Sequence, residues 1–465
     1  MASAQGDPAW LWDNIIGVTP WKKQLDILES VWHNKKTIVK SCHGAGKSYT
    51  AARVGLAFLC AYPGSIVVTT APTGRQVKKI IWQEWRKAVQ KSKKPIGGDV
   101  LTTEHRMNDG WYAFGFATDI PDNFQGLHAE RILVIVDEAA GISPEIWEAI
   151  EGLLTSEGSR LLAIGNPTDP SCEFANMFKE KGIKKMRISA FDTPNFTTYN
   201  ITREDIANNT WREKITGPLP YPVLVTPEWV SGRYEKWGPE SPMYISRVEG
   251  EFPEVGDNIL IPLSWVEKAM ARWHDMAEGT PRELGLDVAR YGGDECALAY
   301  RGGQKVMKIE TWMKNDLMET AGRTNRAIKD YNATMAKIDT IGLGAGVHDR
   351  LKEQKMPVME VDVNKAPKDK EQFADLTSEL WWNLRDMLNP DPAANNFPIG
   401  LPNDEELAHQ LSSRRFSYTS RGQIKVEPKD EMKKRGLQSP DRADAVAIVF
   451  APTPRRKTIG KAVVI

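Results

Sequence analysis

Two groups of residues in this sequence have the types and spacing that phosphate chemistry requires. The first is the run Ser41-Cys42-His43-Gly44-Ala45-Gly46-Lys47-Ser48. It lies between a predicted strand at 37–39 and a predicted helix at 49–60, where N–H groups at the helix start can cradle an anion. In such a loop the lysine reaches the β- and γ-phosphates and the final serine holds Mg²⁺. The run predicts a nucleotide-binding P-loop, with Ser41 in place of the usual first glycine.

An acidic pair ends a later apolar strand. Asp137 and Glu138 follow the run at 131–136. Ligands bind at the carboxyl edge of parallel sheets, although a solvated strand end or a helix cap would also carry such acids. With the P-loop upstream, the pair predicts a Walker B motif. Asp137 then serves the Mg²⁺ shell and Glu138 orients the attacking water.

Five further side chains are weaker candidates for the same site. Gln24 lies before the P-loop strand, where its amide can pair with an adenine edge, and Asn166 follows the strand at 161–164, where it can sense the γ-phosphate. A simple turn explains Asn166 equally well. Arg75, Arg131 and Arg160 are candidates for an arginine finger, and each also fits an ordinary surface position.

The second group consists of aspartates in the later half of the chain. Two lie on predicted strands, one follows a glycine-rich turn, and two share a face at the start of a predicted helix at 441–450: Asp287, Asp339, Asp294, Asp441 and Asp444. Carboxylates from two strands and a helix can hold paired divalent ions that activate water and stabilise the leaving oxygen of a phosphodiester. Oxygen ligands favour Mg²⁺ or Mn²⁺. Taken singly, Asp444 also fits a helix cap and Asp294 a turn, so only the set predicts a ribonuclease-H-like nuclease.

Composition limits where nucleic acid can bind. The 465 residues include 61 Lys or Arg and 61 Asp or Glu, so a globally basic coat protein is excluded. Phosphate contacts must come from local runs such as Lys91–Lys94, Lys181–Arg187 or Lys433–Arg435, each of which also fits a solvated face. Four scattered cysteines exclude a disulfide framework and fit a reducing cytoplasm. No membrane span or signal peptide is expected.

The pattern of elements predicts two α/β domains. Strands alternate with helices up to residue 190, which predicts a P-loop ATPase domain of the RecA/ASCE type with a parallel-rich sheet. A proline-rich linker or small subdomain is expected at 191–260, with irregular structure. A ribonuclease-H-like domain with a mixed sheet is expected at 261–453, followed by a basic tail at 454–465. Helices are expected at 74–94 and 371–388.

The motifs together resemble one family, the large terminase subunits of tailed bacteriophages. The resemblance covers Thr19 to Pro452, and its conjunction of motifs is far more specific than any one of them. They are, in order, WKKQ, SCHGAGKS, TTAPTGRQV, ILVIVDEAAGI, AIGNPT, VEGEFP, LGLDVARYGGDECALAY, IDTIGLGAGVHDRL and SPDRADA. In the nuclease it implies metal-binding roles for Asp287, Asp339 and Asp441, with Asp294 and Asp444 as helpers. In the ATPase it places Asn166 in the motif that couples hydrolysis to DNA movement.

The resemblance also implies the activity and the partners. Members of this family use ATP and Mg²⁺ to move double-stranded DNA into an empty procapsid, and they cut the DNA concatemer with a two-metal endonuclease that also takes Mn²⁺. The implied partners are the portal protein, a small terminase subunit and further copies of the chain, typically five in a ring. The implied location is the host cytoplasm, transiently at the portal vertex and not in the mature virion.

Two other functions remain open at this point. A superfamily-2-like helicase fits the TAPTGRQ segment and requires a second RecA-like lobe after residue 200, which the proline-rich segment and the aspartates disfavour. A portal-docking module with purely structural C-terminal acids fits the same motifs without metal-dependent cutting.

Overall fold

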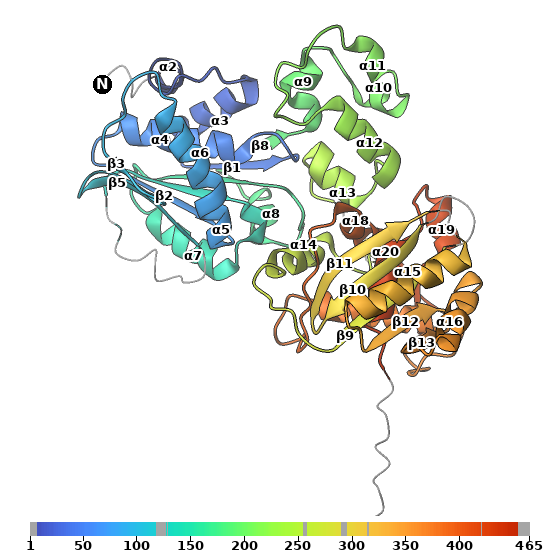
Figure 1. Ribbon diagram of the computed structural model, residues 1–465. Helices are drawn as coiled ribbons and strands as arrows, with labels where there is room; N and C mark the ends of the chain where they lie inside the picture. Colours follow the sequence, from blue (N-terminus) through green and yellow to red (C-terminus); the bar gives the residue numbers. More distant parts are fainter. Residues whose placement is uncertain are drawn as a thin grey trace, which may run out of the picture. The chain divides into compact units, whose positions relative to one another are not determined.

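The computed structural model describes residues 7–117, 127, 129–253, 258–289, 295–313, 316–419 and 421–453. Contacts between residues divide the chain into two compact units, Met1–Val255 and Gly256–Ile465 (Figure 1). The predicted turn aspartate Asp294 and the basic tail at 454–465 lie outside the described residues. In the described residues no helix has the length and apolar character needed to cross a bilayer.

The first unit is built on an eight-stranded sheet in the order β3-β4-β5-β2-β6-β7-β1-β8. Strands from β5 to β8 along that order pair in parallel, and β3 and β4 form an antiparallel edge. The strands are β1 (Lys36–Ser41), β2 (Ile66–Ala71), β3 (Asp99–Val100), β4 (Glu104–Asn108), β5 (Trp111–Ala117), β6 (Ile132–Asp137), β7 (Arg160–Gly165) and β8 (Lys184–Ile188). The predicted parallel-rich α/β fold is confirmed. Its carboxyl edge gathers the ends of β1, β2, β6 and β7.

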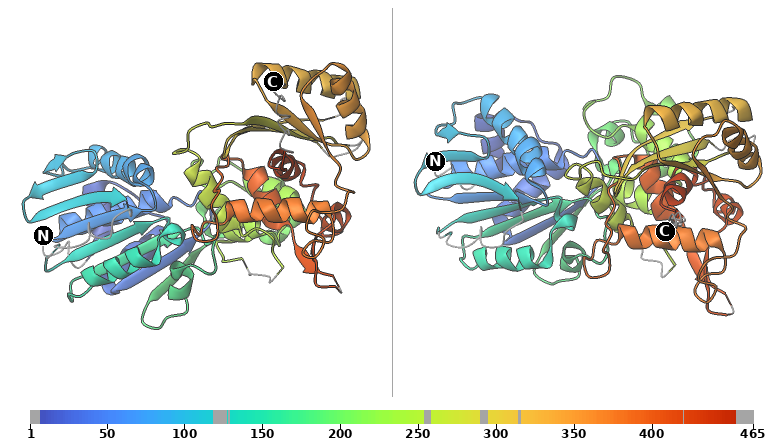
Figure 2. Two further views of the ribbon diagram at one scale, coloured as in Figure 1. Left: turned by 90° about the horizontal axis from the view of Figure 1, so that it is seen from below. Right: turned by 60° about the horizontal axis from the view of Figure 1, so that its bottom comes forward.

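Helices cover both faces of this sheet (Figure 2). Helix α4 (Lys47–Ala61) and helix α6 (Trp82–Gln90) share one face, where a Cβ at Gly55 would lie 2.6 Å from Trp85 and 2.8 Å from Ile135. Helices α7 (Pro144–Leu153) and α8 (Glu173–Met177) pack on the other face, against Val134 and Val136. The remaining elements are α2 (Pro8–Leu11), η1 (Trp12–Ile16), α3 (Lys22–His33), α5 (Gly74–Gln76), η2 (Val77–Ile81), η4 (Ala139–Gly141) and η5 (Ala190–Asp192).

The proline-rich segment contains several helices, so the expectation of irregular structure was wrong for those parts, whereas residues 215–226 are irregular. It contains α9 (Pro194–Thr197), α10 (Arg203–Ala207), α11 (Trp211–Lys214), α12 (Pro227–Trp237), α13 (Pro242–Tyr244) and η6 (Ile245–Glu249). Three of these helices begin at a proline. Proline is tolerated at the first helical position because the N–H that it lacks would have no intrahelical partner there.

The second unit is built on a five-stranded mixed sheet in the order β11-β10-β9-β12-β13. Strands β9, β10 and β11 pair antiparallel, and β12 and β13 continue parallel to β9, as a ribonuclease-H-like sheet requires. Its strands are β9 (Arg282–Asp287), β10 (Cys296–Gly302), β11 (Lys305–Trp312), β12 (Met335–Asp339) and β13 (Val358–Val361), with a separate hairpin of β14 (Phe416–Tyr418) and β15 (Ile424–Val426). The predicted mixed sheet is confirmed.

Helix α20 (Asp441–Val449) lies on one face of this sheet. Helices α15 (Leu317–Asp330) and α16 (Leu343–Glu353) supply Ala321, Ile328, Val347 and Leu351 to the apolar core on the sheet. The other helices are α14 (Leu263–Arg272), α17 (Leu376–Leu388), α18 (Glu405–Ser413) and α19 (Lys429–Lys434). Two predicted helices are shorter than expected. The one expected at 371–388 begins at Leu376, where the Asp375 side chain caps it, and the one expected at 74–94 ends at Gln90.

Candidate active sites

The P-loop runs from the end of β1 into the start of α4. Gly44 and Gly46 adopt φ values of +68° and +78°, which other residues rarely tolerate. Gly44 also accepts a backbone hydrogen bond from the Val225 N–H (2.9 Å), and a Cβ at Gly44 would stand 3.2 Å from that nitrogen. The two glycines therefore set the loop conformation that places the positive N-terminus of α4 behind an anion.

The P-loop lysine is held by the asparagine that follows β7. Lys47 Nζ donates to Asn166 Oδ1 (2.8 Å) and lies 3.4 Å from the Cys42 carbonyl. Asn166 in turn donates from Nδ2 to the Ser41 carbonyl (2.7 Å). Both the oxygen and the nitrogen of the Asn166 side-chain amide therefore contact the P-loop. A phosphate oxygen is a stronger partner for an ammonium than an amide oxygen, because it carries charge.

The Walker B pair lies against the end of the P-loop. Ser48 Oγ donates to Asp137 Oδ2 at 2.6 Å. Burial, reinforced by the neighbouring Glu138, raises the pKa of Asp137 to about 6, while Ser48 and Lys47 oppose the rise. Glu138 has a left-handed φ of +52°, a conformation that costs a non-glycine residue about 1 kcal/mol and that is concentrated at functional sites.

The other predicted nucleotide residues also lie around the loop. Gln24 is buried, donates to Thr50 Oγ1 (3.1 Å), and its Nε2 would lie 3.7 Å from a Cβ at Gly46. His43 stacks on Trp229, with ring centroids 6.0 Å apart, and burial together with Lys47 lowers its pKa to about 4. The stacked ring is therefore neutral at pH 7. Burial raises the pKa of Cys42 to about 12, so its thiol is not a nucleophile.

The strand directions place the three candidate arginine fingers at different edges of the sheet. Arg131 directly precedes β6 and Arg160 begins β7, so both lie at the amino edge of the parallel sheet, opposite the P-loop within this chain. Arg131 stacks over Tyr62, 4.5 Å from the ring centroid. Arg75, in α5 after β2, is the one of the three at the carboxyl edge.

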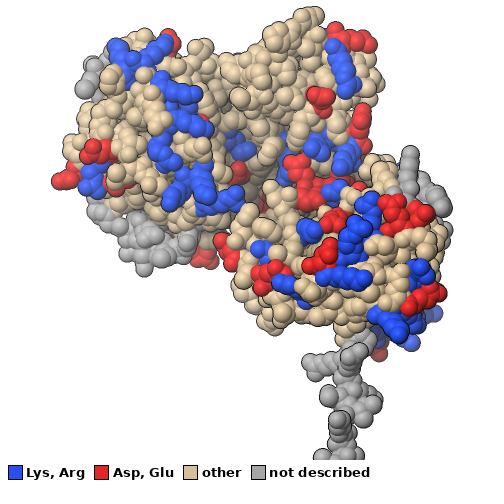
Figure 3. Space-filling model, viewed as in Figure 1, with Lys and Arg blue, Asp and Glu red and all other residues tan. Residues whose placement is uncertain are grey.

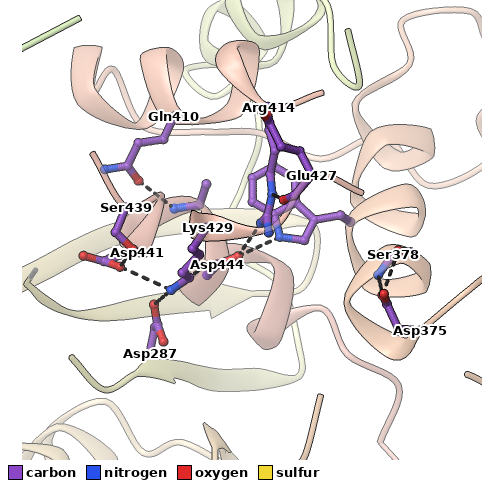
Figure 4. Close-up of polar contacts among 12 residues, drawn as sticks. Asp287, Asp375, Ser378, Gln410, Arg414, Glu427, Lys429, Ser439, Asp441 and Asp444 are labelled. Carbon is purple, nitrogen blue, oxygen red and sulfur yellow. Dashed lines mark hydrogen bonds and ion pairs between the residues drawn. The ribbon is translucent and has the colours of Figure 1, made fainter. Parts of the chain in front are cut away.

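In the second unit, four of the predicted aspartates come together, and Figure 4 shows three of them, Asp287, Asp441 and Asp444. Asp287 and Asp339 end the neighbouring parallel strands β9 and β12, and Asp441 and Asp444 occupy the first turn of α20. They line one cavity of about 380 Å³. Gly285 makes this convergence possible, because a Cβ there would lie 2.4 Å from a backbone carbonyl of α20.

A lysine that sequence analysis missed stands at the centre of these acids. Lys429 Nζ lies 2.8 Å from Asp444 Oδ2, 3.1 Å from Asp287 Oδ2 and 3.3 Å from Asp441 Oδ1 (Figure 4). It sits in the run EPKDEMKKR, where nothing distinguishes it from its solvated neighbours. Only the packing of α19 beside the pocket identifies it.

Further contacts hold the acids in place. Asp444 Oδ1 accepts from Trp381 Nε1 (2.7 Å) and from Arg414 (2.9 Å). Asp441 accepts from the Ser439 hydroxyl and from the backbone N–H of Glu295 (3.0 Å). Because these donors lie on several elements, the carboxylates are oriented before any ion binds.

The charges of the cluster are strongly coupled. Burial raises the pKa of Asp287 to about 7, opposed by Lys429 and reinforced by the other aspartates. Burial raises the pKa of Asp441 as well. Burial would also raise the pKa of Asp444, but the positive charges of Lys429 and Arg414 outweigh the effect of burial and lower this pKa. Burial opposes the charge on Lys429, yet the surrounding aspartates raise its pKa well above the ordinary value.

The carboxylate oxygens of this pocket suit a hard divalent cation. Among the described residues no three His, Cys, Asp or Glu side chains stand as a ready metal site. The ammonium group of Lys429 occupies the point on which three carboxylates converge. All of the available ligands are carboxylate oxygens, the type that Mg²⁺ and Mn²⁺ prefer. A divalent ion at that point requires the side chain of Lys429 to withdraw, and this side chain is 38% exposed.

The two units define a class of α/β chain in which a P-loop sheet precedes a ribonuclease-H-like sheet with an acid cluster. No family model matches the chain. Over 93% of its length it is 26% identical to "Probable terminase, large subunit" of Enterobacteria phage P7, of which 88% is covered. The predicted resemblance to the large terminase subunits of tailed bacteriophages is thereby confirmed.

Solved terminase structures are also similar, at low identity. The nuclease domain of the large terminase subunit of bacterial virus Sf6 is 20% identical, with a TM-score of 0.38, and it covers 42% of this chain and all of its own. The large terminase of a thermophilic bacteriophage in complex with ADP is 12% identical, with a TM-score of 0.39, over 92% of this chain and 99% of its own.

Asp287→Asn tests the electrostatic description of the acid pocket. Because the folded-state pKa of Asp287 is raised from 3.8 to about 7, the folded protein binds this proton more tightly than the unfolded chain. The group therefore costs stability as the pH rises through that window. We expect the melting temperature of the variant, relative to wild type, to be higher at pH 8 than at pH 5 without divalent ions. The exposed helix cap Asp316→Asn is the control, and an equal difference at both pH values would contradict the description.

Lys429→Met tests whether the lysine and a divalent ion compete for one position. Coulomb repulsion between like charges a few Å apart exceeds about 1.4 kcal/mol at an effective dielectric constant near 20, so we expect Mn²⁺ to bind at least about tenfold more tightly to the variant. The melting temperature without metal falls, and Mn²⁺ restores it. Isothermal titration and thermal melts measure both effects, with Lys429→Arg as the charge-preserving control. Equal Mn²⁺ affinity in wild type and Lys429→Met would rule out competition.

Proposed function

We propose that this chain is an ATP-driven motor that translocates viral double-stranded DNA into a procapsid and cleaves concatemeric DNA. The observation that carries the proposal is the pairing of two sites in one chain. The first unit has a P-loop lysine and an acidic pair at one sheet edge, and the second has four aspartates lining one cavity. The likeness to the phage P7 protein supports the same function.

In the first site, Gln24 and the loop from Ser41 to Ser48 bind ATP. Lys47 leaves Asn166 for the β- and γ-phosphates, so Asn166 responds directly to nucleotide binding. Ser48 and Asp137 hold the Mg²⁺ shell, which neutralises phosphate charge, and Glu138 orients the attacking water. The terminase that was solved with ADP supports adenine nucleotide as the ligand.

In the second site, Asp287, Asp339, Asp441 and Asp444 hold the divalent ions. Bound Mg²⁺ or Mn²⁺ supplies an activated water and stabilises the leaving oxygen of the phosphodiester. Trp381 and Arg414 fix Asp444, and Lys429 keeps the acids together until the ions bind. One solved Sf6 nuclease domain contains manganese, which supports this choice of metal.

The partners follow from this function. They are double-stranded DNA, the portal protein, a small terminase subunit and further copies of the chain, which we propose to form a ring of five on the procapsid. The motor then works in the host cytoplasm and at the portal vertex. No membrane partner is proposed.

Both alternatives are less well supported. A helicase needs a second parallel RecA-like sheet, whereas the second unit has three antiparallel strands in a mixed sheet. A docking module with structural acids gives no reason for four carboxylates to line one cavity, since gathering like charges out of water is costly.

Substitutions in the first site separate nucleotide binding from hydrolysis. We expect Lys47→Ala to lose nucleotide binding and turnover, because the phosphate cation is gone. Glu138→Gln should bind ATP normally but hydrolyse it at least about 100-fold more slowly, because the amide does not orient water as the carboxylate does. Fluorescent-nucleotide titration and phosphate release measure the two properties. Normal turnover by Glu138→Gln would assign the catalytic role elsewhere.

Substitution in the second site separates DNA cutting from ATP turnover. Wild type with supercoiled plasmid and Mn²⁺ should produce nicked and linear DNA. We expect Asp287→Ala to lose this activity and to retain ATP turnover, since the two sites lie in different units. Lys47→Ala is the reciprocal control. Intact plasmid with wild type would favour the docking module, and normal cutting by Asp287→Ala would refute the proposed nuclease site.

A further inference from the structure

One surface of the first unit is strongly basic although the chain has no net charge. Between Gly74 and Lys94 the sequence has eight Lys or Arg residues and one carboxylate, Glu84. These residues lie on the continuous run α5–η2–α6 and the turn that follows it, and Figure 3 shows Lys and Arg gathered in a band over this run. We call the surface formed by Arg75, Lys78, Lys79, Arg86, Lys87, Lys91, Lys93 and Lys94 the basic band.

Most of the charge of the basic band is not neutralised by the residues that the structure describes. Glu84 pairs with Lys87 and with the buried Arg53, and Lys93 pairs with Asp13. Arg75, Lys78, Lys79 and Lys91 form no ion pair with any other described residue, and all four are exposed. Four positive charges thus face solvent along the run and at its end.

The composition of the basic band favours a polyanion over a protein partner. Protein interfaces are depleted of lysine and contain apolar anchors at their centre. Among the large apolar side chains of the run, Ile80 is the exposed one, at 43%. Phosphate backbones, in contrast, are bound by lysine and arginine with little apolar contact. The 17 residues of the run span about 25 Å, which matches roughly seven base pairs of duplex.

The basic band begins beside the Walker B turn. A Cβ at Gly141, three residues after Glu138, would lie 2.7 Å from Pro72 Cγ, and Pro72 directly precedes the N-cap residue of α5, Thr73. The strained backbone at Glu138 and the start of the basic band are therefore in contact through η4.

We propose that the basic band binds the phosphate backbone of double-stranded DNA and that it moves when the Walker B turn changes conformation. The inference rests on the proposed function and goes beyond it by assigning the surface of the ATPase unit that contacts the DNA. Contacts of this kind are independent of base sequence, as packaging of a whole genome requires.

The test compares two triple variants of the full chain with equal loss of charge. One is Lys78→Ala with Lys79→Ala and Lys91→Ala. The control is Lys181→Ala with Lys184→Ala and Lys185→Ala, which removes the other exposed basic run of this unit. Affinity for a short duplex of mixed sequence is measured by fluorescence anisotropy at stepped salt concentrations, without divalent ions so that no cutting occurs.

Each phosphate contact contributes about 0.9 to the slope of log K against log salt, so the first variant should lose about 2.7 from that slope and the control nothing. ATP binding should be unchanged in both. Equal slopes for wild type and the first variant, or loss in the control alone, would overturn the inference. So would loss of self-association with an unchanged slope, since the surface would then bind a second copy. If wild type itself shows no salt-dependent DNA binding, the proposed function fails as well.

Discussion

Carboxylates packed together out of water need a cation between them, and the second unit is organised around that constraint. Asp287, Asp441 and Asp444 converge because Gly285 lets α20 lie directly on β9. Without a partner such a group would protonate or force the elements apart. Lys429 supplies the charge from α19, and Trp381 and Arg414 fix the acid nearest to it. The carboxylates of the pocket are consequently held in place for a cation. The position between them is occupied by the ammonium group of Lys429, which belongs to the chain itself.

In the first unit the group that needs a partner is a cation, and its partner within the chain is an uncharged amide. Lys47 is a cation that needs an anion, and the group that holds it is the neutral amide of Asn166. When a phosphate oxygen replaces the Asn166 amide oxygen beside Lys47, no ion pair is broken. When a divalent ion replaces the ammonium group of Lys429, three ion pairs are broken. The nucleotide site is therefore easily occupied, while occupation of the acid pocket depends on movement of a charged side chain.

Much of both folds could be predicted from the sequence, because apolar strands alternate with periodic helices and because the polar residues at strand ends form recognisable sets even though each alone has another explanation. The four aspartates that the structure describes lie together as expected. Lys429 could not be predicted, since its charge run resembles any solvated helix, and only the tertiary packing of α19 sets it among acids from three other elements. The proline-rich segment was mispredicted in part for a local reason: three of its prolines, Pro194, Pro227 and Pro242, lie at helix starts, which composition alone does not distinguish from loops.

Close backbone approaches are the features that connect the chemistry to the rest of each unit. In the first unit, Gly141 and Pro72 leave no room between η4 and the residues before α5. Proline fixes its own φ, so the Pro72 side of this contact is stiff. A change in the Glu138 backbone that moves Gly141 toward Pro72 would press on the residues that lead into α5. In the proposal above, this contact is the route by which a change at the Glu138 turn reaches the start of the basic band.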